Sequence, residues 1–257
     1  MQTSVDLNAD MSESFGAWAI GDDAALLEVV TSANVACGFH AGDPDVMART
    51  MARAVACDVG IGAHPGFADL QGFGRRRIDL GHETLGNIVR YQLGAAQAVA
   101  RAAGGTVRHL KLHGALANMA SEDAGLARAA YAAAMSVDPE IILMVLAGTA
   151  QEAAARDLDA RVACEIFADR AYKEDCTLVD RRDPGAVIHD ARLAAERVLA
   201  MIRAGAIIAE SGVHIPTRID TICLHGDTPA AVAIARALRS ELEAGGLRVG
   251  LFEGVRG

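Results

Sequence analysis

The chain has 257 residues, 52% of them hydrophobic, and its 33 acidic against 24 basic side chains give a net charge of −9. This acidic balance argues against a nucleic acid or an anionic membrane as partner, because both need a basic patch. The five cysteines form no CxxC pair, the N-terminus has no signal-peptide pattern, and no apolar run reaches the roughly 18 residues that span a bilayer. These features predict a cytoplasmic protein with reduced thiols.

Short apolar runs alternate with segments of helical periodicity along the whole chain. Strands are predicted at residues 4–10, 31–40, 59–65, 107–114, 141–148, 161–170, 221–227 and 248–254. Helices are predicted at residues 22–30, 44–57, 83–103, 121–136, 149–157, 184–204 and 228–244. No linker interrupts this alternation. We therefore expect one domain over residues 1–257, an α/β fold in which seven or eight strands form a closed or nearly closed βα barrel. An open doubly wound sheet is the alternative.

Local signals mark several helix starts and one long irregular segment. Asp43-Pro44 and Asp227-Thr228-Pro229 fit an N-cap followed by an early proline, and Thr149 with Glu152 fits a capping box. Residues 169–185, DRAYKEDCTLVDRRDPG, are the longest stretch without a hydrophobic period. This segment is either a lid over a site or a plain surface loop.

Polar side chains collect where the predicted strands end. In barrels and open α/β sheets, sites form where the carboxyl ends of the strands meet the following loops. Six predicted strands end in an acid, a histidine or a basic residue, a pattern that packing alone does not explain. Asp43 and Asp227 also fit as helix caps alone, and Asp6 is left out as a residue of the opposite strand face. The set is Asn8, Asp10, His40, Asp43, His64, Lys111, His113, Glu165, Asp169, Arg170, His225 and Asp227.

These residue types suggest hydrolytic or acid–base chemistry. Histidines and carboxylates together bind a divalent metal or act as general acid and base without one. Metal ligation would draw on Asp10, His40 and His64, although no HxH or HxxxH spacing points to it. Lys111 could neutralise an oxyanion or a substrate carboxylate.

Two further motifs leave alternatives open. Cys37 is either a nucleophile beside a histidine or a small buried strand residue. Arg75, in GFGRRR, belongs either to an anion clamp or to a solvated turn. Neither a P-loop nor a GxGxxG motif precedes any predicted helix.

Six motifs between about residues 5 and 227 carry a family resemblance. They are DLNADMSESFG, SANVACGFHAGDP, GAHPGFADLQGFGRR, KLHGALAN, EIFADRAY and LHGD, in that order. Together they resemble the LamB/YcsF family, and six motifs in one order are far more specific than any one of them.

The resemblance implies a distorted seven-stranded (β/α) barrel related to the glycoside hydrolase/deacetylase superfamily. It implies hydrolysis of 5-oxo-L-proline, a lactam, to L-glutamate with conversion of ATP, bound with Mg²⁺, to ADP and phosphate. It also implies two partner proteins, subunits B and C, and leaves a homo-oligomer open. On this basis Asp10, His40, His64, Lys111 and His113 are expected to be catalytic. The residues expected to bind substrate are Asn8, Glu13, Asp43, Arg75, Asn118, Glu165, Asp169, Arg170, His225 and Asp227.

The chain departs from the family pattern at three positions. Ser12 stands where the first motif usually has glycine, and Leu112 and Ala117 replace the proline and tyrosine of the usual KPHGALYN. The polar set is retained. Two other functions remain as alternatives: a metal-dependent amidase or deacetylase that acts alone, and a non-catalytic protein that binds a small carboxylate within a complex.

Overall fold

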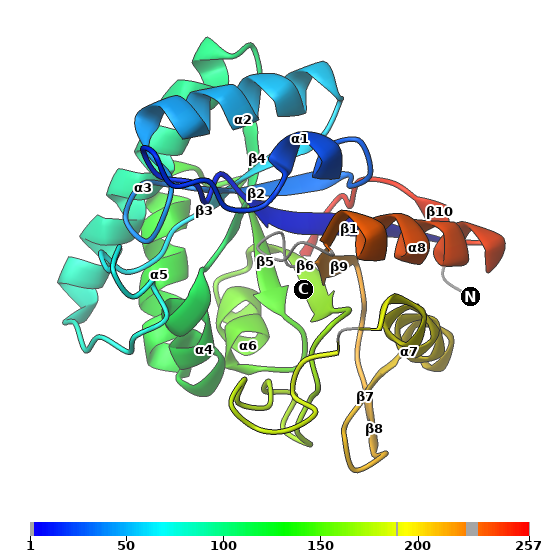
Figure 1. Ribbon diagram of the computed structural model, residues 1–257. Coiled ribbons are helices and arrows are strands. Elements are labelled where there is room, and N and C mark those ends of the chain that lie inside the picture. Colours follow the sequence, from blue (N-terminus) through cyan, green and yellow to red (C-terminus); the bar gives the residue numbers. More distant parts are fainter. Residues whose placement is uncertain (1–2, 189, 225–230, 257) are drawn as a thin grey trace.

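Seven parallel strands close into a barrel in the computed structural model, which describes residues 3–188, 190–224 and 231–256 (Figure 1). Neighbouring strands pair in chain order, and the last one, β9, pairs with both β6 and β1, which closes the ring. The expected barrel is confirmed and the open sheet is excluded. The strands are β1 (Ser4–Met11), β2 (Ser32–Ala36), β3 (Gly60–His64), β4 (Val107–Lys111), β5 (Ile142–Leu146), β6 (Arg161–Phe167) and β9 (Thr221–Leu224).

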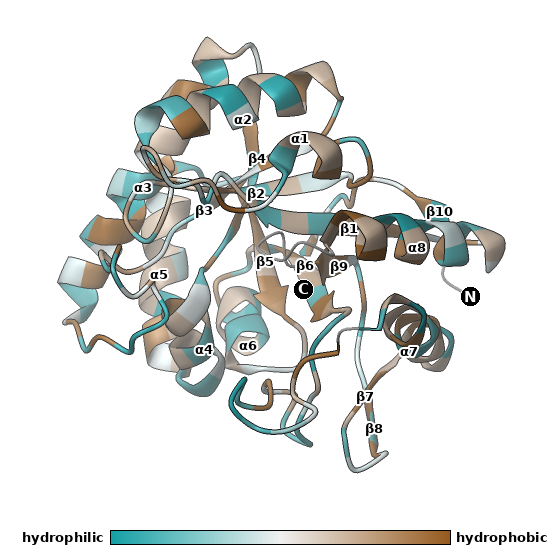
Figure 2. Cartoon of the chain, viewed as in Figure 1, coloured by the Kyte–Doolittle hydropathy of each residue, from teal (hydrophilic) through white to brown (hydrophobic). Residues whose placement is uncertain are grey.

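Helices surround the barrel, and teal and brown residues alternate along α2 and α8 in Figure 2, as expected for helices with one face on the core. The caps of two helices match the sequence signals: Asp43 caps α2 with proline at its first position, and Thr149 caps α6. The predicted cap at Asp227 lies outside the described residues. The helices are α1 (Asp23–Leu26), α2 (Pro44–Ala56), α3 (His82–Ala102), α4 (Gly114–Glu122), α5 (Ala124–Val137), α6 (Ala150–Asp157), α7 (Ala191–Ala204) and α8 (Ala231–Ala244).

Several elements differ from the prediction. Helix α4 was not predicted, and the helix expected at 121–136 corresponds to α5, which starts where the carboxylate of Asp123 accepts from the backbone of Gly125 and Leu126. A hairpin of β7 (Ala206–Ile208) and β8 (His214–Pro216) was not expected, and it projects away from the barrel in Figure 1. The strand expected at 248–254 shrinks to β10 (Arg248–Val249).

The C-terminal segment completes the barrel where β9 closes the ring between β1 and β6. β9 pairs with β1 only from Asp6 onward and with β6 only from Glu165 onward. Below that level β10 pairs with the start of β1, and β11 (Val255–Arg256) runs antiparallel to the start of β6. The barrel is distorted here because three strands, β9, β10 and β11, divide the position between β1 and β6.

Strand alternation puts apolar side chains outside the barrel and polar ones inside it. Along β1, Leu7 and Ala9 pack in the main core with the helices, whereas Asp6, Asn8 and Asp10 alternate with them. Barrel interiors are usually filled by branched apolar residues. Here the interior is charged and hydrogen-bonded over much of its height, so each polar group needs a partner. Among the described residues, no helix combines the length and hydropathy that crossing a bilayer requires.

Phe252 closes the bottom of the barrel. Its ring is buried in a small cluster with Ile142, Met144 and Ala163, side chains on the inner face of β5 and β6. We expect Phe252→Ala to lower the free energy of unfolding by about 3 kcal/mol, the usual cost of deleting a buried ring. The neighbouring Leu251 is 41% exposed, so Leu251→Ala should cost less than about 1 kcal/mol. Urea unfolding of both variants measures the difference. Equal losses of unfolding free energy would contradict the role given to the Phe252 ring.

Candidate active site

A cavity of about 620 Å³ opens at the carboxyl ends of the strands. Its floor is charged and its walls come from the loops that follow β3, β4 and β6. Nine of the residues expected from the sequence line it: Asp10, Glu13, His64, Arg75, Lys111, His113, Asn118, Glu165 and Arg170. This is the position at which barrel proteins build their sites.

Lys111 is the buried centre of the cavity floor. Its ammonium nitrogen lies 2.9 Å from Asp10 Oδ1, 2.8 Å from Glu165 Oε1 and 2.9 Å from Cys223 Sγ. Burial alone would lower the pKa of Lys111, but the facing acidic groups raise it well above its ordinary value. The lysine therefore stays charged and joins β4 to β1, β6 and β9.

The same surroundings raise the pKa of Glu165 and so favour its neutral form. Burial raises the pKa of its carboxyl group, the charge of Asp10 raises it further, and Lys111 opposes both. Its side chain lines the cavity. A buried carboxyl group with a raised pKa can hold a proton and donate it.

Asp6, Asn8 and Asn34 form a hydrogen-bonded layer beneath Lys111. Asn34 donates to Asn8 and Asp10, and its side-chain oxygen lies 2.8 Å from a ring nitrogen of His109. The exclusion of Asp6 from this face is wrong, because residues 6, 8 and 10 share one side of a strand by period-two alternation. Asp6 accepts from Ser32 and two threonine hydroxyls inside the barrel.

His64 and His113 face each other across a short gap. The Nδ1 atom of His64 lies 2.8 Å from the Lys111 carbonyl oxygen, and the Nε2 atom of His113 lies 2.9 Å from the Phe73 carbonyl oxygen. Since a carbonyl only accepts, each of these ring nitrogens carries a hydrogen. The other ring nitrogens, His64 Nε2 and His113 Nδ1, are 3.0 Å apart. A cation placed beside them would have both nitrogens as donors.

Two carboxylates flank the facing nitrogens. Asp10 Oδ2 lies 3.4 Å from His64 Nε2, and Glu13 Oε1 lies 3.9 Å from His113 Nδ1. Ligand atoms of Glu13, His40, His64 and His113 all lie within 4.8 Å of one another, so this buried group could hold a metal ion. Imidazole and carboxylate are ligands that zinc and related divalent metals accept. Compared with the metal ligands expected from the sequence, the group adds Glu13 and His113, and Asp10 stands beside it.

His40 lies behind His113 rather than in the cavity wall. The two rings stack with their centroids 3.6 Å apart and their planes 6° apart. Because an imidazole binds a metal in the plane of its ring, two stacked rings cannot both point at one ion without one of them turning. Burial lowers the pKa of His40 well below its ordinary value and that of His113 to about 3, and the neighbouring histidines lower both further. Both rings are therefore neutral at pH 7.

Glycines leave the space that these rings occupy. A Cβ atom on Gly62 would lie 2.0 Å from His109 Nε2, and one on Gly66 would lie 2.7 Å from His40 Nδ1. Gly74 combines a φ of +61° with a similar approach to His40 and His113. The GIGAHPG and GFG segments are thus needed to seat three histidines.

The remaining predicted residues lie elsewhere. Asn8 is beneath the floor, and Asp169 is buried after β6 but outside the cavity lining. Asp43 accepts from the backbone of Gly16, Asp45 and Val46, which is a capping role. Cys37 is buried and hydrogen-bonded to the Val35 carbonyl, with its thiol pKa raised to about 12 by burial. His225 and Asp227 lie outside the described residues.

The segment 169–185, expected to be either a lid over a site or a plain surface loop, lines the cavity through Lys173 and residues 177–182, which include Arg181 and Arg182. The first of these two expectations fits this position, although none of these residues was named as a site residue. Gln151 was missed because it acts from a helix: it hydrogen-bonds Tyr131, Ser121 and the Ala117 carbonyl.

The fold and the site together define a βα-barrel protein whose strand-end cavity carries the groups of acid–base and metal-assisted chemistry. The LamB/YcsF family model matches residues 5–257, and the chain belongs to this family. It is 66% identical over 251 residues to the A subunit of 5-oxoprolinase from Ruegeria pomeroyi, covering 98% of this chain and 99% of that one. It is 51% identical to the corresponding 5-oxoprolinase chain of Nitrobacter hamburgensis, covering 97% and 98%.

Solved structures agree with the fold. A lactam utilization protein from Thermus thermophilus superposes with a TM-score of 0.91 and 44% identity, covering 97% of this chain and all of that one. A T48 deacetylase (TM-score 0.51, 15% identity, 98% and 94% covered) and a GH113 β-1,4-mannanase (TM-score 0.51, 9% identity, 95% and 100% covered) share the fold alone. The glycoside hydrolase/deacetylase-like barrel is confirmed.

The facing histidine nitrogens predict divalent-metal binding. We expect His64→Gln and His113→Gln to weaken binding of Co²⁺ or Zn²⁺ by at least about tenfold, since each removes a donor of the group. His82→Gln, on the exposed start of α3, serves as the control and should bind like the unaltered chain. Metal content after dialysis and the visible absorption of Co²⁺ measure this. Equal binding by all variants would refute the site.

The raised pKa of Asp6 predicts an unusual pH dependence of the free energy of unfolding. Burial raises the pKa of Asp6 from 3.8 to about 6, and its hydroxyl partners only partly oppose this. The folded state therefore holds the proton more tightly, so this contribution to stability is complete below pH 3.8 and is lost as the pH rises through about 6. Relative to Asp6→Asn, the chain should lose roughly 2–3 kcal/mol between pH 4 and pH 7. Urea unfolding of both proteins across this range would show a constant difference if the prediction is wrong.

Proposed function

We propose that this chain is the lactam-hydrolysing component of an ATP-dependent 5-oxoprolinase, converting 5-oxo-L-proline to L-glutamate. The observation that carries the proposal is the convergence of Asp10, His64 and Lys111 on the cavity floor, at 3.4 Å and 2.9 Å from Asp10. The names of the relatives supply the substrate. Those names also describe one lettered subunit, which supports work within a complex, and subunits B and C are the proposed partners.

The chemistry of a lactam explains the need for ATP. A lactam amide is stabilised by resonance and is a poor electrophile. Phosphorylation of its oxygen activates the ring carbon, after which water needs a base and the ring nitrogen needs an acid. In this proposal the partner subunits use the ATP with Mg²⁺, and this chain opens the ring.

Three groups of the chain take the resulting roles. Asp10, which lies beside His64 at the floor, orients and deprotonates the attacking water. Lys111 remains charged and stabilises the negative charge that develops on oxygen. Burial makes His40 and His113 neutral and raises the pKa of Glu165, so Glu165 is a better proton donor to the ring nitrogen than a second histidine.

A divalent cation fits the same floor. Glu13, His64 and His113 would hold it, with Asp10 beside His64. When bound, such an ion polarises a carbonyl or lowers the pKa of water. The same group favours a second candidate, a metal-dependent amidase that acts alone. The third candidate is a non-catalytic protein that binds a carboxylate within the complex.

Glutamate release from 5-oxo-L-proline separates these candidates. We expect release only when the chain, its partner subunits and ATP are combined. We expect Asp10→Asn to lower the rate by about 10²–10⁴-fold, the range for loss of a general base, with an unchanged circular dichroism spectrum. His82→Gln is again the control.

Each other outcome assigns a different function. Release by the chain alone, without ATP and sensitive to chelators, would establish the independent amidase. Full release by a complex that contains Asp10→Asn and Glu165→Gln would establish a non-catalytic role. Either outcome would overturn the proposal.

A further inference from the structure

Four residues of the barrel interior stand side by side on neighbouring strands. In the strand registers, Asp10 on β1 pairs with Asn34 on β2, and Asn34 pairs with Gly62 on β3. Gly62 in turn pairs with His109 on β4. Asp10 lines the cavity, whereas Asn34 and His109 lie beneath its floor and are fully buried. The register therefore connects a cavity residue to two polar side chains deep in the barrel.

The missing side chain of Gly62 allows His109 to reach Asn34. A Cβ atom on Gly62 would lie 2.0 Å from His109 Nε2, in the space that the imidazole occupies. The ring therefore extends from β4 across β3, and its Nε2 atom lies 2.8 Å from the side-chain oxygen of Asn34 on β2. Glycine weakens the interior of a strand, and it often marks a close approach of another group. Here that group is the ring of His109.

The hydrogen bonds of Asn34 have one consistent direction. A carboxylate only accepts, so the amide nitrogen of Asn34 faces Asp10 Oδ1, 2.9 Å away. The amide oxygen then faces His109 and can only accept from the ring, so the hydrogen of His109 is on Nε2. Burial lowers the pKa of His109 to about 3, which makes the ring neutral, with one hydrogen. The other ring nitrogen, Nδ1, has no hydrogen-bond partner among the residues that the structure describes.

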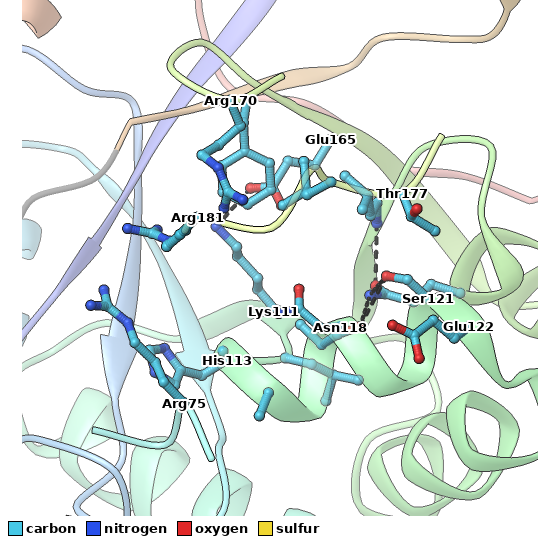
Figure 3. A pocket seen from close by; sticks show the side chains of 18 of the residues that line it. Arg75, Lys111, His113, Asn118, Ser121, Glu122, Glu165, Arg170, Thr177 and Arg181 are labelled. Carbon is cyan, nitrogen blue, oxygen red and sulfur yellow. Dashed lines mark hydrogen bonds and ion pairs between the residues drawn. The ribbon is translucent and has the colours of Figure 1, made fainter. Parts of the chain in front are cut away.

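Asn34 also determines which oxygen of Asp10 faces the histidines. Asp10 Oδ1 accepts from Asn34 and from the ammonium group of Lys111, each at 2.9 Å, and Oδ2 lies 3.4 Å from His64 Nε2. Lys111 is shared, because its side chain also runs to Glu165, 2.8 Å away (Figure 3). An ammonium group is a point charge on a flexible stem and does not by itself fix the rotation of a carboxylate. The second donor, from Asn34, fixes it.

We propose that Asn34 and His109 are positioning residues for Asp10. Asn34 holds the carboxylate so that Oδ2 points toward His64, and His109 prevents the amide of Asn34 from turning over. A turned amide would place its oxygen against Oδ1, and two acceptors repel each other. The proposal rests on the proposed function, in which Asp10 deprotonates the attacking water. Because a small misplacement of a catalytic group slows a reaction strongly, both residues act on the rate rather than on substrate binding.

The position of the His109 hydrogen is testable without any turnover. We expect a long-range proton–nitrogen correlation spectrum of the full chain, with labelled histidines at pH 7, to show the hydrogen of His109 on Nε2 and none on Nδ1. The spectrum of His109→Leu identifies the signals of this ring by their loss. A hydrogen on Nδ1, or a ring that carries both hydrogens, would overturn the proposal.

Turnover distinguishes a hydrogen-bond donor from a side chain that only fills space. With partner subunits, ATP and a limiting amount of this chain, His109→Leu should lower kcat for glutamate release at least about tenfold and leave KM for 5-oxo-L-proline within about twofold. His109→Gln keeps an N–H donor near the position of Nε2 and should restore most of the rate. Equal losses in the two variants, or no loss in His109→Leu, would overturn the positioning role.

Asn34→Asp tests the next residue of the row. The substitution keeps the size of the side chain and removes both of its N–H donors, so kcat should again fall at least about tenfold. Asn87→Asp is the matched control, since Asn87 is exposed on α3. Circular dichroism of each variant establishes that it is folded, and the two histidine variants carry the test if Asn34→Asp does not fold.

Two outcomes separate this proposal from the proposed function. An unaltered kcat in folded Asn34→Asp would overturn the positioning role and leave the proposed function in place. If the unaltered chain releases no glutamate in any mixture, the proposed function fails, and the nitrogen spectrum alone then decides whether His109 and Asn34 hold Asp10.

Discussion

A single ammonium group holds the interior of the barrel together. Lys111 reaches from β4 to carboxylates on β1 and β6 and to a thiol on β9. β9 is the strand that closes the ring between β6 and β1, so these contacts lie on both sides of the closure. An apolar residue at this position would leave two buried carboxylates without their cation, which is far more costly than the loss of an exposed ion pair.

This constraint explains why so much of the interior is polar. Once charges occupy the centre, the layer beneath them must hydrogen-bond as well, and Asn8, Asn34, Thr221 and Asp6 do so. Apolar side chains pack instead on the outer face of the strands and in the small cluster around Phe252. Such an interior stabilises less than a packed apolar one, but it holds the side chains of the cavity floor in fixed positions, as electrostatic preorganisation requires.

The barrel was predictable because its signals are local and repeated. Apolar runs, cap residues such as Asp43, and glycines beside histidines recur along the chain, and each implies a strand, a turn or a helix start. The start of α4 was not predictable in this way, because His113 precedes it without a side-chain cap and its first residues continue the preceding strand motif. The hairpin of β7 and β8 is only three residues on each side and contributes no inner face to the barrel.

The residues that form the site were predictable from the sequence, and their roles were less so. Strand-end position predicted that Asp10, His64 and Lys111 meet, but only three-dimensional packing shows which groups are charged. That Arg75 and Arg181 line the same cavity could not be foreseen either, because they are far apart in the chain and come together only through the fold.

The cavity carries charges of both signs, and this limits what it can bind. Glu13, Asp10 and the facing histidine nitrogens favour a cation, whereas Lys111 at the floor and the arginines that line the wall favour an anion. Ala117, which stands in the place of the family's usual tyrosine, also lines the cavity, so its small side chain leaves room in the wall without altering these charges. Charge therefore restricts the class of ligand here, and the wall near Ala117 adjusts only its shape.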